Sequence, residues 1–166
     1  ARGVESFLSD IQETAALLTQ IPVVQNPRGI EEQGWRGLYE KFGGEVNFLF
    51  LQDPQGILTL AYPPEPLRGI IGINLGSEHY FQEARRTGRP IMSGAGPLRG
   101  EKIFEGRQGI GSIVIAAPIF RKGEFAGILG CGVDPGKVHV RNNTPIRSGA
   151  TGGAWMISQE GKFVAH

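Results

Sequence analysis

The sequence predicts an α+β fold in which helices precede an antiparallel sheet of about five strands. Three observations predict it. Apolar residues recur at helical spacing up to residue 21, short apolar runs without that spacing begin at residue 46, and turn signals separate these runs. The chain has 166 residues, of which 40% are apolar and 20% charged, a length and composition typical of one globular domain.

Two helices open the predicted order of elements. From Val4 to Ile21 the apolar residues follow spacings of three and four, which places them on one stripe of a helix, and we expect Pro22 to end it. A second helix is predicted from Ile30 to Phe42, because apolar residues recur there at similar spacing and two glycines follow as a stop signal.

A β-hairpin is predicted next. The apolar runs 46–51 and 57–62 lack helical periodicity, and the segment between them contains Pro54 and Gly56. Proline presets φ for a turn and glycine supplies a positive φ, so the two runs are expected to pair as antiparallel strands.

A short helix is predicted from His79 to Arg86, with Ser77 as its N-cap and Gly88 as its stop signal. The run 89–93 is expected to form an edge strand, because Pro90 cannot donate a backbone hydrogen bond.

The centre of the sheet is predicted to consist of two strands, Ile110–Phe120 and Glu124–Val133, which the turn Arg121-Lys-Gly123 joins. Four glycines lie inside these strands: Gly111, Gly127, Gly130 and Gly132. Glycine within a strand marks a bend, a bound ligand or the close approach of another backbone. The alternative that we favour is close packing of a helix on the sheet.

The end of the chain repeats the layout of the first hairpin. An apolar run at 152–157 and another at 162–165 flank a turn that closes on Gly161. We therefore expect a second module that is cut off after its opening hairpin, and divide the chain into residues 1–44, 45–135 and 136–166. The chain opens on Ala-Arg-Gly without an initiator methionine, so we expect it to be a fragment of a longer protein.

No catalytic motif is present in the sequence. It contains no phosphate-binding loop, no nucleophile elbow and no His-Glu-x-x-His pair, so we do not expect this fragment to be an enzyme. The three histidines are isolated and Cys131 is the single cysteine, so neither a metal site nor a cofactor is predicted. Seventeen basic residues balance sixteen acidic ones, which argues against nucleic acid as a partner.

A small-molecule pocket is the remaining candidate function. A sheet covered on one face by a short helix and long loops can enclose a pocket with apolar walls and a few polar anchors. The residues that we assign to its wall are Tyr80, Phe81, Arg89, Ser93, Ser112 and Asp134. The alternative for the pair Tyr80-Phe81 is ordinary core packing, which we expect for at least one of the two.

The order of several motifs resembles the Cache domain family, the extracytoplasmic PAS-like sensor modules of bacterial and archaeal membrane receptors. These motifs are Phe48-Leu-Phe-Leu-Gln-Asp-Pro-Gln-Gly-Ile57, Tyr80-Phe81-Gln-Glu-Ala84 with Thr87-Gly88, Ile113-Val-Ile-Ala-Ala-Pro118 and Phe125-Ala-Gly-Ile-Leu-Gly130. The trailing segment Thr151-Gly-Gly-Ala-Trp-Met-Ile157 resembles the start of the membrane-proximal module in the double-Cache form.

The resemblance implies a periplasmic or extracellular domain of a cell-membrane receptor, whose membrane-distal module binds an organic acid, an amine or an amino acid. It also implies an N-terminal helix that continues from a transmembrane span and could pair in a homodimer. The output that it implies first is a histidine kinase, with a methyl-accepting chemoreceptor or a diguanylate cyclase as alternatives.

The resemblance also suggests which residues would bind the ligand. Amino-acid-binding members carry an arginine two positions before the aromatic pair, which grips the ligand carboxylate, and an aspartate after the last strand, which grips its ammonium. Glu78 stands at the arginine position of this chain, and the aspartate position falls on Gly132, with Asp134 two residues later. A carboxylate could instead use Arg89, Lys102 or Arg107, and an amine could use Glu78 with the aromatic faces.

Two further classes remain open. A dimerisation module without a ligand would show a packed interior around Tyr80 and Ser112. A PAS-like enzyme or cofactor carrier would need a ligand for heme or flavin, and no histidine or cysteine is placed to supply one.

Overall fold

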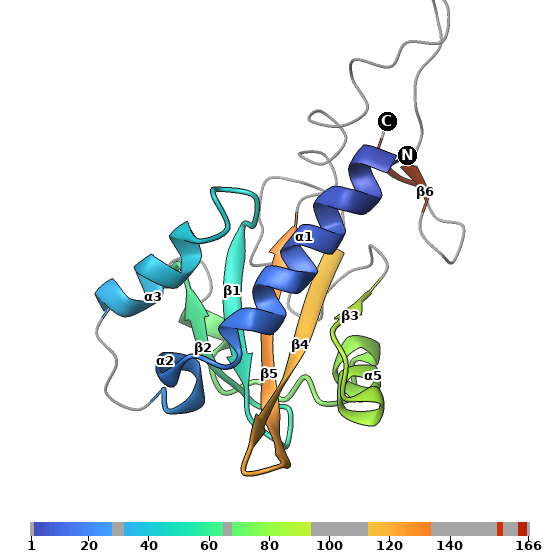
Figure 1. The fold of residues 1–166 in the computed structure, drawn as a ribbon. Coiled ribbons are helices and arrows are strands. Elements are labelled where there is room, and N and C mark those ends of the chain that lie inside the picture. The colour runs from blue at the N-terminus through green and yellow to red at the C-terminus, as the bar shows by residue number, and fades with distance from the viewer. Residues whose placement is uncertain are drawn as a thin grey trace, which may run out of the picture.

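The structure is a computed structural model, and it describes residues 2–27, 32–64, 68–93, 113–133, 156–157 and 163–165. Its main feature is a five-stranded sheet (Figure 1). The strands are β1 (Phe48–Gln52), β2 (Leu58–Tyr62), β3 (Ile91–Met92), β4 (Ile113–Arg121) and β5 (Glu124–Val133). They follow the order β2-β1-β5-β4-β3, and all neighbours are antiparallel. The predicted fold class is confirmed.

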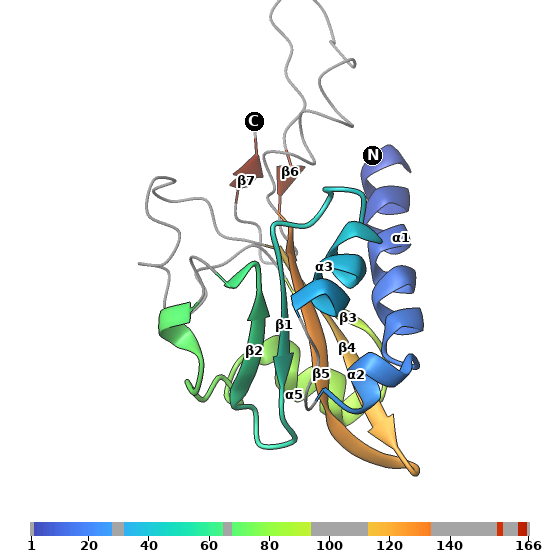
Figure 2. The same ribbon diagram turned by 90° about the vertical axis from the view of Figure 1, so that its left-hand side faces the viewer.

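Helices cover both faces of this sheet. They are α1 (Arg2–Leu18), α2 (Pro22–Gln25), α3 (Glu32–Glu40) and α5 (His79–Thr87), with a 3-10 turn, η1, at Arg68–Ile70. The first three helices lie on one face, where α1 packs against β4 and β5 and α3 packs against β2, while α5 lies on the other face against β3, β4 and β5 (Figure 2). Within the described part of the chain, no helix combines the length and apolar character that crossing a bilayer requires.

The two faces have separate cores because side chains alternate along each strand. The face under α1 buries Leu49, Ile115, Leu129 and Cys131 against the helix stripe that includes Ile11. The opposite face is defined here as the α5 face and consists of Phe48, Phe50, Leu58, Tyr80, Phe81, Ala84, Val114, Ala116 and Ile128. Strands β1 and β4, which both pair with β5, contribute side chains to both cores, as does β5 itself.

The first helix differs from the prediction at its C-terminal end. It stops at Leu18, and Pro22 is the first residue of the separate four-residue helix α2. Proline suits that position because the first N–H groups of a helix have no partner within the helix. The expected role of Pro22 as the end of the first helix was therefore wrong.

The N-cap of α5 also differs from the prediction. Glu78, in extended conformation, occupies the N-cap position in place of Ser77, and no side chain caps the helix. The backbone N–H of Glu78 donates to the carbonyl of Leu75 over 3.1 Å, so residues 75–78 form a turn, and the helix begins at His79 as predicted. Gly88 follows the helix in left-handed conformation, as the stop signal predicts.

The glycines of β5 do not face a helix, although close packing of a helix on the sheet was the explanation that we favoured. The rings of Phe50 and Phe48 lie against Gly130 and Gly132, so that a Cβ at either glycine would overlap the ring. Gly127 has a φ of 120°, and a Cβ there would overlap the backbone carbonyl of Gln52, which is the close approach of another backbone that we gave as one possibility. Gly111 lies outside the described residues.

Two short strands are described near the C-terminus, β6 (Met156–Ile157) and β7 (Phe163–Ala165), and they pair antiparallel as a separate two-stranded sheet. Their positions agree with the expected second hairpin. The division of the chain into modules stays a prediction.

Candidate ligand-binding site

The α5 face brings the aromatic pair of the sequence prediction onto the sheet. Tyr80 and Phe81, in the first turn of α5, are 2% and 1% exposed. The ring of Tyr80 meets the ring of Phe50 edge to face, with centroids 6.1 Å apart, and Phe48 lies beside Phe50 at 5.9 Å. The sheet and the helix thus enclose a buried aromatic cluster on this side of the molecule.

The hydroxyl of Tyr80 is a polar group within this otherwise apolar cluster. It is buried and has no hydrogen-bond partner. Burial raises the pKa of Tyr80, and the nearby Glu78 carboxylate raises it further, so the hydroxyl stays protonated at neutral pH and can donate. Most buried hydroxyls are hydrogen-bonded, and leaving one unsatisfied costs roughly 1–3 kcal/mol.

A second buried polar atom on β1 also lacks a partner. Gln52 is 2% exposed, and its amide nitrogen donates to the carbonyl of Gly56 over 2.8 Å, while its Oε1 accepts no hydrogen bond. Gln52 stands opposite Ile128 in the ladder, and Ile128 belongs to the α5 face. Directly opposed residues of an antiparallel pair share a face, so Gln52 belongs to the α5 face as well.

The other predicted site residues do not all gather around Tyr80. Glu78 is half-buried at the N-terminus of α5, next to Tyr80. Arg89 is exposed beyond the other end of the same helix. At 1.5 Å per residue it lies about 13.5 Å along the helix axis from Tyr80, and it therefore does not join Glu78 and Tyr80. Ser93 follows β3, and its Oγ accepts a hydrogen bond from the backbone N–H of Val114 over 3.3 Å. Ser112 and Asp134 lie outside the described residues.

The sequence prediction missed Phe48, Phe50 and Gln52. A usable signal existed for the two aromatic residues, because alternation along 46–51 places them on one face of the strand. Their contact with Gly130 and Gly132 depends on pairing between β1 and β5, which lie far apart in the sequence. The burial of Gln52 left no signal, because a glutamine next to a turn is usually exposed.

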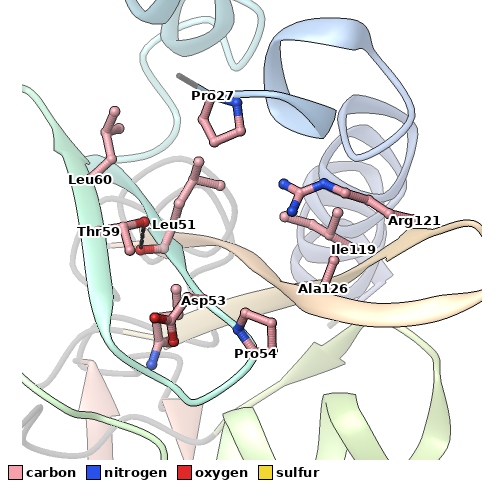
Figure 3. A pocket seen from close by; sticks show the side chains of 10 residues that line it. Pro27, Leu51, Asp53, Pro54, Thr59, Leu60, Ile119, Arg121 and Ala126 are labelled. Carbon is pink, nitrogen blue, oxygen red and sulfur yellow. Dashed lines mark hydrogen bonds between the residues drawn. The ribbon is translucent and has the colours of Figure 1, made fainter. Parts of the chain in front are cut away.

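A pocket of about 310 Å³ opens on the opposite face of the sheet, and the sequence prediction did not include it (Figure 3). Its residues are Pro27, Leu51, Asp53, Pro54, Thr59, Leu60, Ile119, Arg121 and Ala126, together with Gln52, which therefore borders this pocket although its pairing with Ile128 places it on the α5 face. Most of its polar groups already serve the fold. Asp53 Oδ1 accepts from the N–H groups of Gln55 and Ile57 over 2.9 Å each, and Thr59 donates to the carbonyl of Leu51 over 3.3 Å.

No metal centre is apparent in the described ranges, where no three side chains of His, Cys, Asp or Glu come together. Cys131 is fully buried in β5, and burial raises the pKa of its thiol to about 12. A thiol with this pKa is protonated at neutral pH and is a poor nucleophile or metal ligand.

Comparison with known proteins gives matches in structure but none in sequence. No protein-family model and no curated protein sequence matches the chain. The ligand-binding domain of the Pseudomonas aeruginosa amino acid chemoreceptor PctB, in complex with L-Gln, has a TM-score of 0.63 at 19% identity over 99% of this chain. The sensor domain of E. coli DcuS has a TM-score of 0.62 at 12% identity over 85% of this chain.

An extracellular ligand-binding receptor from Desulfohalobium retbaense has a TM-score of 0.65 at 14% identity over 85% of this chain. The chain spans 26% of that receptor, 63% of the PctB domain and 98% of the DcuS domain. These solved structures are extracellular or sensor domains, and they share with this chain helices packed on an antiparallel sheet. The chain therefore has the PAS-like fold of Cache-type ligand-binding sensor domains.

Proposed function

We propose that this chain is the extracytoplasmic sensing domain of a membrane receptor, and that it binds a small molecule on the α5 face. The observation that supports this site best is the Tyr80 hydroxyl, which is buried without a hydrogen-bond partner in an aromatic cluster. A ligand with an acceptor or donor atom would satisfy it and remove the cost of the unsatisfied group. The aromatic rings would provide the apolar wall.

We infer the ligand class from the polar groups of the α5 face and of the start of α5. Glu78 lies next to Tyr80, and the α5 face also carries the acceptor Gln52 Oε1. Among the organic acids, amines and amino acids of the sequence prediction, these groups favour a ligand with an amine or ammonium group. The complexes of PctB with L-Gln and of the Pseudomonas fluorescens chemoreceptor CtaA with L-serine support an amino acid as the first compound class to test.

The receptor type is the second part of the proposal. We place a histidine kinase first, as the resemblance implies, and a methyl-accepting chemoreceptor or diguanylate cyclase as alternatives. We further propose that the receptor is anchored in the cell membrane, that α1 mediates a homodimer, and that β6–β7 opens a second module. Reading the parent gene for membrane spans and an output domain tests the anchor and the receptor type.

A dimerisation module without a ligand is the second candidate function. It is favoured by the close packing of Tyr80 and Phe81, which are both almost fully buried. The two candidates differ on the Tyr80 hydroxyl, because only a ligand gives that group a role.

A thermal-shift screen of amino acids, amines and organic acids tests the proposed function. We expect at least one compound to raise the melting temperature in proportion to ln(1 + [L]/Kd), equivalent to about 2.7 kcal/mol at a concentration of 100 Kd. Tyr80→Phe removes an atom without a partner, so it leaves the ligand-free melting temperature unchanged or slightly higher. The same variant should weaken binding about tenfold, and Tyr80→Ala should abolish it.

Arg121→Gln is the matched control, because Arg121 lines the pocket on the opposite face. We expect this variant to respond to the stabilising compound as the unmodified chain does. A shift that survives Tyr80→Phe and Tyr80→Ala but disappears in Arg121→Gln would move the site to the other face. A panel in which no compound stabilises the chain would favour the dimerisation module.

A further inference from the structure

We propose that Gln12 couples the N-terminal helix α1 to the helix α5, so that a change in α5 is transmitted to α1 through one hydrogen bond. The inference rests on the proposed function in one respect, namely that α5 carries the ligand site. It adds to that function the residue through which the site communicates with the rest of the molecule.

The evidence is a side-chain hydrogen bond between segments 78 residues apart. Gln12 Nε2 donates to the backbone carbonyl of Pro90 over 2.8 Å, and both residues are half-buried. Pro90 lies in the connector between α5 and β3, which is defined here as residues 88–90. The bond therefore links α1, on one face of the sheet, to the segment that follows the helix on the other face.

The connector is positioned to move with α5. Gly88 closes the helix in left-handed conformation, and its N–H donates to the carbonyl of Ala84 over 3.0 Å. The side chain of Thr87 donates to the carbonyl of Glu83 over 2.8 Å and accepts from the N–H of Arg89 over 3.3 Å. A displacement of the last turn of α5 is therefore passed to the backbone that carries the Pro90 carbonyl.

The Gln12 bond differs in kind from the other contacts of α1 with the sheet. Ile11 and Ala15 bury apolar surface against that face, and such contacts are non-directional and tolerate small shifts along the helix axis. A hydrogen bond weakens steeply with distance and angle, so it fixes the position of α1 relative to the connector. A movement of α5 that breaks the Gln12–Pro90 hydrogen bond would therefore leave α1 free to shift at Gln12.

The matched comparison is Gln25, which makes the same kind of bond elsewhere. Its Nε2 donates to the carbonyl of Phe120 over 3.1 Å and to that of Thr19 over 2.7 Å, and so ties α2 to the end of β4. Gln25→Glu removes this donor without affecting the connector. This variant shows whether the loss of any glutamine side-chain hydrogen bond has the same effect as the loss of the Gln12–Pro90 hydrogen bond.

Hydrogen–deuterium exchange of the ligand-free chain tests the coupling. Ala84→Gly loosens α5, because glycine is the less favourable residue within a helix. In the otherwise unmodified chain we expect this change to speed exchange of the α1 amides around Gln12 at least about threefold. In the background of Gln12→Glu, which keeps the length of the side chain but removes the donor, we expect faster basal exchange of α1 and no further response to Ala84→Gly.

Gln12→Lys restores a donor of sufficient length and should restore the response, while Gln25→Glu should leave it intact. An α1 that does not respond to Ala84→Gly in the unmodified background would overturn the coupling. So would an equal response in the Gln12→Glu background, because the signal would then pass through the sheet. No ligand is added, so a failed ligand screen and a failed coupling test are separate outcomes.

Discussion

Gly130 in β5 lies directly beneath the ring of Phe50, which in turn contacts Tyr80. We expect Gly130→Ala to destabilise the chain by about 2–3 kcal/mol, because the added methyl group overlaps a ring that is itself packed. Gly37→Ala is the control, since nothing lies within 4 Å of a Cβ at Gly37 in α3. That change should stabilise the chain by about 0.5–1 kcal/mol. Urea unfolding measures both, and equal effects would contradict the packing described for Gly130.

Cys131 provides a residue-level test of the core under α1. Its thiol is fully buried with a pKa raised to about 12, so it should not react with Ellman's reagent at pH 8 until the chain unfolds. The raised pKa also predicts how the free energy of unfolding changes with pH. The free energy of unfolding is unaffected by this thiol below about pH 8.5, where an unfolded cysteine begins to ionise, and falls as the pH rises from there towards 12. Rapid labelling of the folded chain at pH 8 would refute this burial.

Residue roles were only partly predictable from the sequence. Tyr80 and Phe81 were placed on a helix face that packs on the sheet, because their position in a short amphipathic segment fixes that geometry. Ser93 was assigned to the pocket wall, and the structure shows its Oγ bound to the N–H of Val114. Which partner a serine hydroxyl finds depends on tertiary contacts, and spacing along the chain carries no information about them.

At the scale of elements, α1 owes its position to one buried stripe. Ile11 is 1% exposed and Leu17 is 71% exposed on the same helix. We expect Ile11→Ala to lower the free energy of unfolding by about 2–4 kcal/mol through lost burial and a cavity. Leu17→Ala should change it by less than about 0.5 kcal/mol. Chemical denaturation of the two variants compares them, and a cost at Leu17 equal to that at Ile11 would mean that the stripe is misassigned.

Several elements were predictable because turn or stop signals bound their apolar runs or helical periods. β5 has the predicted bounds, and α5 extends one residue beyond the predicted end. The four-residue helix α2 was not predicted, because a segment of this length is too short to show a helical period. The N-cap of α5 was placed one residue too early, because residue preference at helix ends does not resolve a shift of one position.

At the scale of the whole molecule, the sequence indicated an antiparallel sheet but not its strand order. β1 pairs with β5 across most of the domain, and only tertiary packing decides such a pairing. The same pairing creates the aromatic cluster of the α5 face. Alternation along β1 could place Phe48 and Phe50 on one face of the strand, but only the pairing shows that Phe50 meets Tyr80. The likeness to sensor domains at 12–19% identity covers 85–99% of the chain, so widely different sequences adopt this fold.

Which face of the sheet receives a small molecule can be measured by methyl NMR, with mixtures of amino acids, amines and organic acids titrated into the labelled chain. We expect the largest chemical-shift changes at Val114, Ala116 and Ile128, whose methyl groups lie on the α5 face. Leu51 and Ile119, which line the pocket on the opposite face, should stay unchanged. Shifts concentrated at Leu51 and Ile119, or no saturable shift with any mixture, would contradict a sensor site beneath α5.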